Sequence, residues 1–102
     1  VERAAQWTTG ATEHGKLRRL QEWIIDHPRA DLSVEALAAL VAMSPRNFSR
    51  AFAARTRSTP ARFVERARLQ RARAMLETTA ETVEAIAAAC GFKCADVMAR
   101  VM

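Results

Sequence analysis

Apolar side chains recur along this chain at spacings of three and four residues, which is the period of an amphipathic α-helix. The spacing predicts a first helix from Lys16 to about His27, with Leu17 and Ile24 on its buried side. Pro28 ends this helix, because the residue before a proline disfavours helical backbone. Residues 1–15 lack the period and contain Thr-Thr-Gly-Ala-Thr, so they are predicted to form a linker or an arm.

Two shorter helices joined by a tight turn are predicted next. Ser33 is a good N-cap for the second helix, whose buried side carries Leu37 and Val41. Ser44 caps the third helix, and Pro45 suits its first position, where the N–H that a proline lacks would be unpaired. Two short helices joined by a turn of about three residues form a helix-turn-helix arrangement.

A longer helix is predicted from Thr59-Pro60 to about Glu77. Its apolar residues are Phe63, Val64, Ala67, Leu69, Ala72, Met75 and Leu76. These positions surround much of the helix circumference, and a helix with two apolar sides packs against two bodies. The same helix carries a basic stripe of Arg62, Arg66 and Arg73 that faces either solvent or phosphate.

The first helix-turn-helix unit is repeated at the end of the chain. Residues 33–39 read Ser-Val-Glu-Ala-Leu-Ala-Ala, and residues 82–88 read Thr-Val-Glu-Ala-Ile-Ala-Ala. One extra residue, Lys93, shifts the offset from 49 to 50, so that Arg50 corresponds to Arg100. Two reading helices on one rigid linker can enter major-groove segments about 34 Å apart on one face of DNA. The repeat therefore predicts an all-α fold with two helix-turn-helix units and a connecting helix.

Composition and charge favour a polyanion partner. The chain has 102 residues, half of them apolar, with no Tyr, three Gly and three Pro, which fits one small all-α domain. Its net charge is +5, but residues 46–73 hold nine arginines against one acid, Glu65, and carry +8. Such a local basic block is typical of nucleic-acid binding. A membrane partner is not expected, because no apolar run reaches about 18 residues and no long helix pairs a basic face with an apolar one.

The sequence offers little for catalysis or metal binding. Cys90 and Cys94 have no histidine near them in sequence, whereas a structural zinc site needs four ligands, so both are interpreted as reduced thiols. His27 lies near a helix end, where a positive charge is favourable, and His14 lies in the predicted linker. No nucleophile-base set, paired carboxylates or glycine-rich phosphate loop is present, so we expect neither an enzyme nor a cofactor or metal.

The third helix has the pattern of a reading helix. Phe48 and Phe52 fall on one side, and Arg46, Ser49 and Arg50 fall on the opposite side. Arginine can contact guanine bidentately, and serine can contact bases or phosphates. An ordinary surface helix with solvated arginines remains an alternative for this stretch considered alone.

Several segments resemble the DNA-binding domain of the AraC/XylS family of bacterial transcription regulators, over about residues 16–102. The segments that carry the resemblance are 32–38, 43–52, 59–64, 68–69, 72–76, 86–87 and 90–92. The sequence of residues 43–63 is most similar to that of the subgroup whose upstream domain is glutamine-amidotransferase-like (ThiJ/PfpI-like).

The resemblance implies base contacts from the two reading helices and regulation through contact with RNA polymerase. Carried onto this chain, the base-contacting positions are Arg46, Asn47, Ser49 and Arg50, and then Ala95, Asp96, Ala99 and Arg100. The expected phosphate contacts are Ser33, Ser44, Arg55 and Lys93. The resemblance also implies double-stranded DNA as the partner, an upstream sensor domain that carries any dimer contacts, and a cytoplasmic, nucleoid-associated location in a bacterium.

The predicted organisation is an arm at 1–15, a first helix-turn-helix subdomain at 16–59, a connecting helix at 60–78 and a second subdomain at 79–102. Three departures from the family pattern matter. Arg57 stands where the family usually has glycine, and Cys94 replaces a serine cap. The sequence stops at Met102, inside the last reading helix, so the second unit is expected to be truncated and frayed or unfolded. The alternative function is therefore a DNA-incompetent fragment that acts, if at all, through protein contacts.

Overall fold

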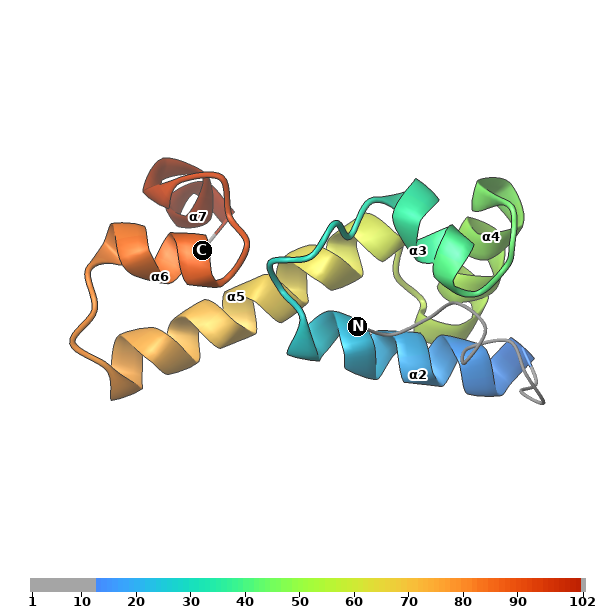
Figure 1. Ribbon diagram of the computed structural model, residues 1–102, viewed down its shortest axis with the longest axis horizontal. Helices are drawn as coiled ribbons and strands as arrows, with labels where there is room; N and C mark the ends of the chain where they lie inside the picture. The colour runs from blue at the N-terminus through green and yellow to red at the C-terminus, as the bar shows by residue number, and fades with distance from the viewer. Residues whose placement is uncertain (1–12, 102) are drawn as a thin grey trace.

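Helices make up all the regular secondary structure in the computed structural model, which describes residues 13–101 (Figure 1). The described helices are α2 (Glu13–Asp26), α3 (Val34–Leu40), α4 (Pro45–Thr56), α5 (Pro60–Thr78), α6 (Val83–Ala89) and α7 (Ala95–Val101). The all-α fold class is confirmed, and the predicted order of short and long helices is the observed one.

Hydroxyl caps begin four of these helices. Ser33 accepts a hydrogen bond from the backbone N–H of Ala36 at 3.2 Å, and Ser44 accepts one from Asn47 at 3.2 Å. Thr59 does the same at the start of α5, as does its counterpart Thr82 at the start of α6. Each cap satisfies one of the N–H groups that a helix start leaves unpaired. The caps predicted at Ser33, Ser44 and Thr59 are confirmed. Thr82 repeats in the second unit the cap that Ser33 forms in the first.

The first helix starts earlier than its apolar pattern predicts. It begins at Glu13, inside the predicted arm, rather than at Lys16. Gly15 costs a helix about 1 kcal/mol but does not stop it, and an acidic residue at a helix start is favourable. Residues 1–12 of the predicted arm, including Trp7, lie outside the described residues.

The long helix α5 is shared by two hydrophobic cores. The first core contains Leu17, Leu20, Ile24, Leu32, Leu37, Ala38, Val41, Phe48, Phe52 and Val64. The second contains Ala72, Ile86, Ala87, Cys90 and Met98. Val64 and Ala72 both belong to α5, so the prediction that this helix packs against two bodies is confirmed.

The second unit is folded in the structure. Ile86 is fully buried and Met98 is only 1% exposed, and both pack with Ala72 of α5. The expectation that residues after 79 are frayed or unfolded is therefore wrong for the described part of this unit. The reason is that five buried side chains already form a core of their own.

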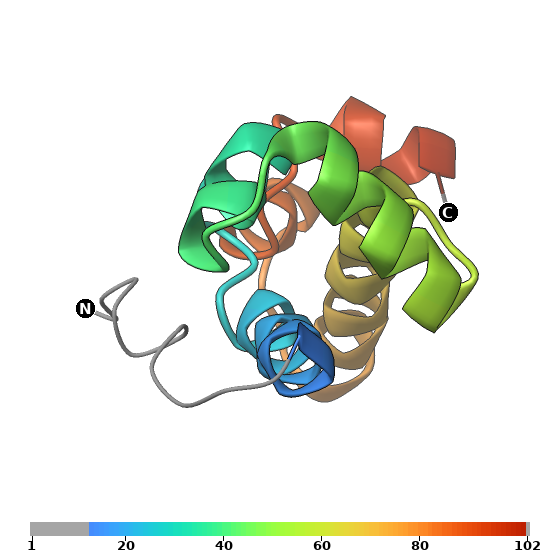
Figure 2. The ribbon, with the colours of Figure 1, turned by 90° about the vertical axis from the view of Figure 1, so that its right-hand side faces the viewer.

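The two units lie at opposite ends of an elongated molecule. Its principal dimensions are 43 × 25 × 19 Å. In Figure 1, α3 and α4 lie at one end and α6 and α7 at the other, with α5 running between them. Figure 2, viewed from the first unit, shows α2 beside α5 and below α3 and α4. This arrangement separates α4 from α7 while one continuous helix connects their units.

Candidate nucleic-acid interface

Helix α4 is anchored through its aromatic side. Phe48 and Phe52 are fully buried, and their ring centroids are 5.5 Å apart. Phe52 also meets Phe63 of α5 edge-on, at 5.3 Å between centroids. Aromatic pairs at this separation contribute beyond the area they bury. The packed side of α4 therefore fixes which side chains its other face presents to solvent.

The exposed face of α4 differs by two residues, Ser49 and Ala54, from the face that the sequence predicts. Arg46, Asn47 and Arg50 are exposed, as predicted, but Ser49 is half-buried. Ala54, which was not predicted as part of the site, is exposed beside them. Helical spacing from the buried Phe48 and Phe52 would have indicated Ala54, because it follows Arg50 by four residues.

A hollow lies against this exposed face. Its volume is about 320 Å³, and it is lined by Met43, Asn47, Arg50, Ala51 and Ala54. Asn47 and Arg50 contribute polar groups to its lining, and the other three residues are apolar. This combination suits contact with the edge of a base or with a methyl group.

Helix α7 repeats the arrangement with fewer polar groups. Asp96, Ala99 and Arg100 are exposed, and Met98 occupies the buried position that corresponds to Phe48. Ala95 is half-buried and packs against the second core, so it is less accessible than the other predicted contacts. Arg100 is the one cation that α7 contributes to this face.

Three of the four predicted phosphate contacts are exposed at the starts of helices or in turns. The hydroxyl oxygens of Ser33 and Ser44 accept from their own helices, which leaves their O–H groups able to donate. Lys93 is exposed in the turn before α7. These positions are compatible with an anionic partner.

Arg55, the fourth, has a structural partner. Its Nε donates to the side-chain oxygen Oε1 of Gln21 on α2 at 2.9 Å. The side chain is half-buried between the two helices. The phosphate contact of Arg55 stays a prediction, and its Nε already joins α4 to α2.

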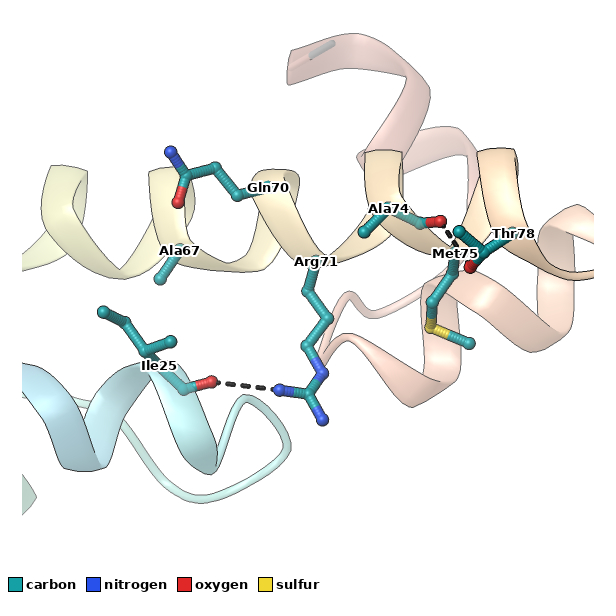
Figure 3. A pocket seen from close by; sticks show the side chains of 7 residues that line it. All are labelled: Ile25, Ala67, Gln70, Arg71, Ala74, Met75 and Thr78. Carbon is teal, nitrogen blue, oxygen red and sulfur yellow. Dashed lines mark hydrogen bonds between the residues drawn. The ribbon is translucent and has the colours of Figure 1, made fainter.

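Two further arginines of the basic block also bind protein atoms. Arg68 donates from Nε to the carbonyl oxygen of Pro28 at 3.0 Å, and Arg71 donates from Nη1 to that of Ile25 at 3.2 Å (Figure 3). Burial lowers the pKa of Arg68 from its ordinary value. The arginines of the block that remain exposed without these roles are Arg46, Arg50, Arg57, Arg62, Arg66 and Arg73. The cationic surface is thus smaller than the sequence count of +8 suggests.

A second hollow, beside the contact between Arg71 and Ile25, has mixed chemistry. It has a volume of about 320 Å³ and lies between α2 and α5. Figure 3 shows the side chain of Ala67 pointing toward Ile25, while that of Gln70 extends from the other side of α5 in this view. It holds no nucleophile paired with a base, which is the minimum for covalent catalysis.

Residues 13–101 also bear on two other kinds of site, a metal centre and a membrane span. No three His, Cys, Asp or Glu side chains lie close enough together there to hold a metal ion. None of the helices described there is both long and apolar enough to cross a membrane. His27 has the helix-end role predicted for it: its Nδ1 lies 2.9 Å from the carbonyl oxygen of Trp23, and the two rings stack at 4.5 Å.

Known proteins share both the sequence and the fold. A family model described as "Helix-turn-helix domain" matches residues 37–102. The chain is 52% identical over 64 residues to HTH-type transcriptional regulator Rv1931c of Mycobacterium tuberculosis, covering 63% of this chain and 25% of that protein. It is 38% identical over 77 residues to HTH-type transcriptional activator RhaS of an Enterobacter species, covering 76% and 28%. The chain thus spans about a quarter of the length of these curated relatives.

Two solved structures match the arrangement of the helices. The DNA-binding domain of AdpA, a global transcriptional factor solved with a target DNA, gives a TM-score of 0.77 at 33% identity, covering 80% of this chain and 74% of that one. A probable AraC family transcriptional regulator from Rhodopseudomonas palustris gives 0.71 at 33% identity, covering 83% and 81%. With the family match over residues 37–102, these likenesses show that the chain belongs to the AraC family of helix-turn-helix transcriptional regulators.

Proposed function

We propose that this chain binds double-stranded DNA in a sequence-specific manner, with α4 and α7 in successive major-groove segments. The observation that carries the proposal is the repeated reading helix. Arg50 on α4 and Arg100 on α7 are both exposed, opposite the buried Phe48 and Met98. A molecule 43 Å long can present two such helices at a separation of about 34 Å, one turn of DNA.

Base reading is assigned mainly to the first unit. Arg46, Asn47 and Arg50 offer the donors that distinguish guanine and adenine in the major groove. The second unit contributes Arg100, with Ala99 beside it for contact with a thymine methyl group. Asp96 would accept from cytosine but would repel a phosphate. We therefore expect the half of the site read by α4 to be the more strongly specified.

The exposed arginines supply affinity that does not depend on sequence. Each phosphate they neutralise releases counterions, so the affinity falls as salt rises. The AdpA domain, which was solved with a target DNA, shares this fold and supports the same partner for this chain.

The test is fluorescence anisotropy of this chain on a random duplex across a salt series, followed by selection of a preferred sequence. We expect a steep fall in affinity with salt and a selected duplex that binds more tightly than the random one at every salt concentration. Absence of binding at low salt would refute the proposal. It would favour the alternative of a fragment that acts through protein contacts.

The regulator as a whole is proposed to have further parts and partners. An upstream sensor domain would bind the effector and carry any dimer contacts. The sequence of residues 43–63 suggests that this domain is amidotransferase-like. RNA polymerase would be the second partner, and the bacterial nucleoid the location. These proposals rest on the family resemblance, and the transcriptional roles of Rv1931c and RhaS support them.

A further inference from the structure

The loop between α2 and α3 belongs to the first unit but touches both α5 and the second unit. Arg68 of α5 donates from Nε to the carbonyl oxygen of Pro28 at 3.0 Å and from Nη2 to that of Ala30 at 3.5 Å. In Figure 1 this loop lies beside the turn that connects α6 to α7. Three segments far apart in sequence therefore meet at one point between the units.

Gly91, in the α6–α7 turn, completes this junction. A Cβ atom at Gly91 would lie 2.0 Å from the carbonyl oxygen of Pro28 and 2.7 Å from Nε of Arg68. A backbone oxygen cannot move out of the way as a flexible side chain can. The second unit can thus approach the first this closely only because residue 91 has no side chain.

The repeat provides an internal control for this requirement. Ala42 occupies the position in the first unit that corresponds to Gly91, and its φ of 57° is also in the left-handed region. This turn position therefore accepts a residue with a Cβ atom where its φ is near 57°. At Gly91 two causes exclude a side chain: a φ of 89°, which residues with a Cβ atom rarely adopt, and the close carbonyl oxygen of Pro28.

Arg71 makes a second contact across the same region. Its Nη1 donates to the carbonyl oxygen of Ile25 at the end of α2, as Figure 3 shows. Its charge also lowers the pKa of the Cys90 thiol, against the larger effect of burial. Arg68 and Arg71 both donate to carbonyl groups at the end of α2 and just beyond it, where such groups lack helical partners.

We propose that Arg68 and Gly91 are positioning residues that lock the second unit in one rotation about α5 relative to the first. Because α4 and α7 belong to different units, this lock sets the spacing and helical phase of the two DNA segments that the chain can read together. The second part of the proposal rests on the proposed DNA-binding function, whereas the first part does not.

A helix-helix contact alone defines the rotation of one unit relative to the other only loosely. The second unit packs on α5 through Ala72, which is small, and Met75, whose side chain is flexible, so neither strongly resists rolling. Arg68 adds hydrogen bonds with defined directions, and its half-buried position strengthens them by excluding water. The close contact of Gly91 with the carbonyl oxygen of Pro28 prevents the second unit from rotating further toward this loop. Together they select one orientation from those that the core alone would allow.

The lock is tested without DNA by measuring distances between two nitroxide labels by electron spin resonance. One label is placed on the exposed native Cys94, and the other on an introduced Glu35→Cys in α3. A sample without Glu35→Cys measures any reaction of the label with the buried Cys90. We expect a narrow distance distribution, broadened or shifted by both Gly91→Ala and Arg68→Met.

Matched variants separate locking from general damage. Ala42→Gly substitutes the corresponding turn residue of the first unit, although it removes a Cβ atom where Gly91→Ala adds one, and Arg73→Met removes a charge from the exposed side of α5; both should leave the distribution unchanged. Arg68→Lys keeps the charge but not the directed pair of donors, so it should broaden the distribution partly. Distributions for Gly91→Ala and Arg68→Met that match the parent, in samples with the parent's helix content, would overturn the proposal.

The consequence for DNA is tested on the duplex selected by the parent chain and on versions with one or two base pairs inserted between the two read segments. The parent should lose affinity on the altered spacings. Gly91→Ala and Arg68→Met should reduce this discrimination by at least about fivefold, the low end of the cost of one mismatched base pair. Unchanged discrimination with an altered label distance would refute the role in spacing. If the parent binds no DNA at all, the proposed function fails, and the label distances alone decide whether the lock exists.

Discussion

The Nε atom of Arg55 on α4 lies 2.9 Å from Oε1 of Gln21 on α2, and this hydrogen bond ties the reading helix to the first helix of its unit. We expect Arg55→Met to cost about 1 kcal/mol of unfolding free energy, because Gln21 would lose a charged donor at a half-buried site. The salt dependence of DNA binding should stay unchanged. Urea unfolding and the anisotropy salt series measure the two effects.

Arg46→Met is the matched control for Arg55→Met. Arg46 is exposed, so its replacement should leave stability within about 0.5 kcal/mol. If Arg46 contacts a phosphate or an adjacent base, its loss should weaken binding. A drop of about 1 in the salt slope for Arg55→Met would contradict a purely structural role and support Arg55 as a phosphate contact.

The second prediction concerns Arg50, the exposed cation at the hollow on α4. We expect Arg50→Ala to lose about 1–3 kcal/mol on the selected duplex and much less on a random one, because a base contact carries sequence information. Arg62→Ala, on the exposed side of α5, should affect both duplexes alike. An equal loss on both duplexes for Arg50→Ala would show that Arg50 contacts only the backbone.

The caps and the buried sides of the helices could be predicted from sequence because their signals are local. Ser44 lies three residues before the N–H that it accepts from, and Phe48 and Phe52 are one helical turn apart. The internal repeat allowed the second unit to be predicted from the first, because Met98 holds the position that corresponds to Phe48 and both side chains are buried. Each of these inferences needs only the helical period and the chemistry of one or two neighbouring residues.

The partners of the arginines could not be predicted in this way. Arg55 and Gln21 are 34 residues apart, and Arg68 and Pro28 are 40 apart. A guanidinium that binds phosphate and one that binds a loop carbonyl look the same in a sequence. Gly91 matched the family pattern, but the two causes that exclude a side chain there, its φ of 89° and the close carbonyl oxygen of Pro28, are visible only in the structure.

A third prediction follows from the backbone of Arg57, which caps the end of α4 with φ 58° and ψ 30°. A residue with a Cβ atom is disfavoured in this left-handed conformation, whereas glycine adopts it readily. Arg57→Gly should therefore raise the unfolding free energy by about 0.5–1 kcal/mol, measured by urea unfolding. Arg57→Ala should not; an equal gain from alanine would assign the effect to the lost charge.

The fourth prediction compares the caps of the two reading helices. Ser44 accepts from the N–H of Asn47, so Ser44→Ala should cost about 1 kcal/mol. Cys94 holds the same position before α7, and its sulfur is a weak acceptor. Cys94→Ser should therefore stabilise the chain, by up to about 1 kcal/mol. Thermal unfolding of both variants measures this, and a loss of stability in Cys94→Ser would mean that the thiol packs in a way a hydroxyl cannot replace.

The fifth prediction uses the two thiols to measure how firmly the second unit is closed. Cys94 is exposed, whereas Cys90 is buried in the second core with Ile86 and Met98. Burial raises the pKa of the Cys90 thiol, with a smaller opposing effect from Arg71, so little reactive thiolate forms there near neutral pH. A disulfide reagent should therefore titrate one thiol quickly and the second only as the unit opens.

Three controls assign the two phases of this reaction. Cys94→Ser should remove the fast phase, and Cys90→Ala the slow one. Because the folded state holds the Cys90 proton more tightly than the unfolded state, stability should fall as the pH rises past the ordinary thiol pKa. Subdenaturing urea should accelerate the slow phase. Two equally fast thiols would mean that the second unit opens freely despite its buried core, and α7 would then be a poor reader of DNA.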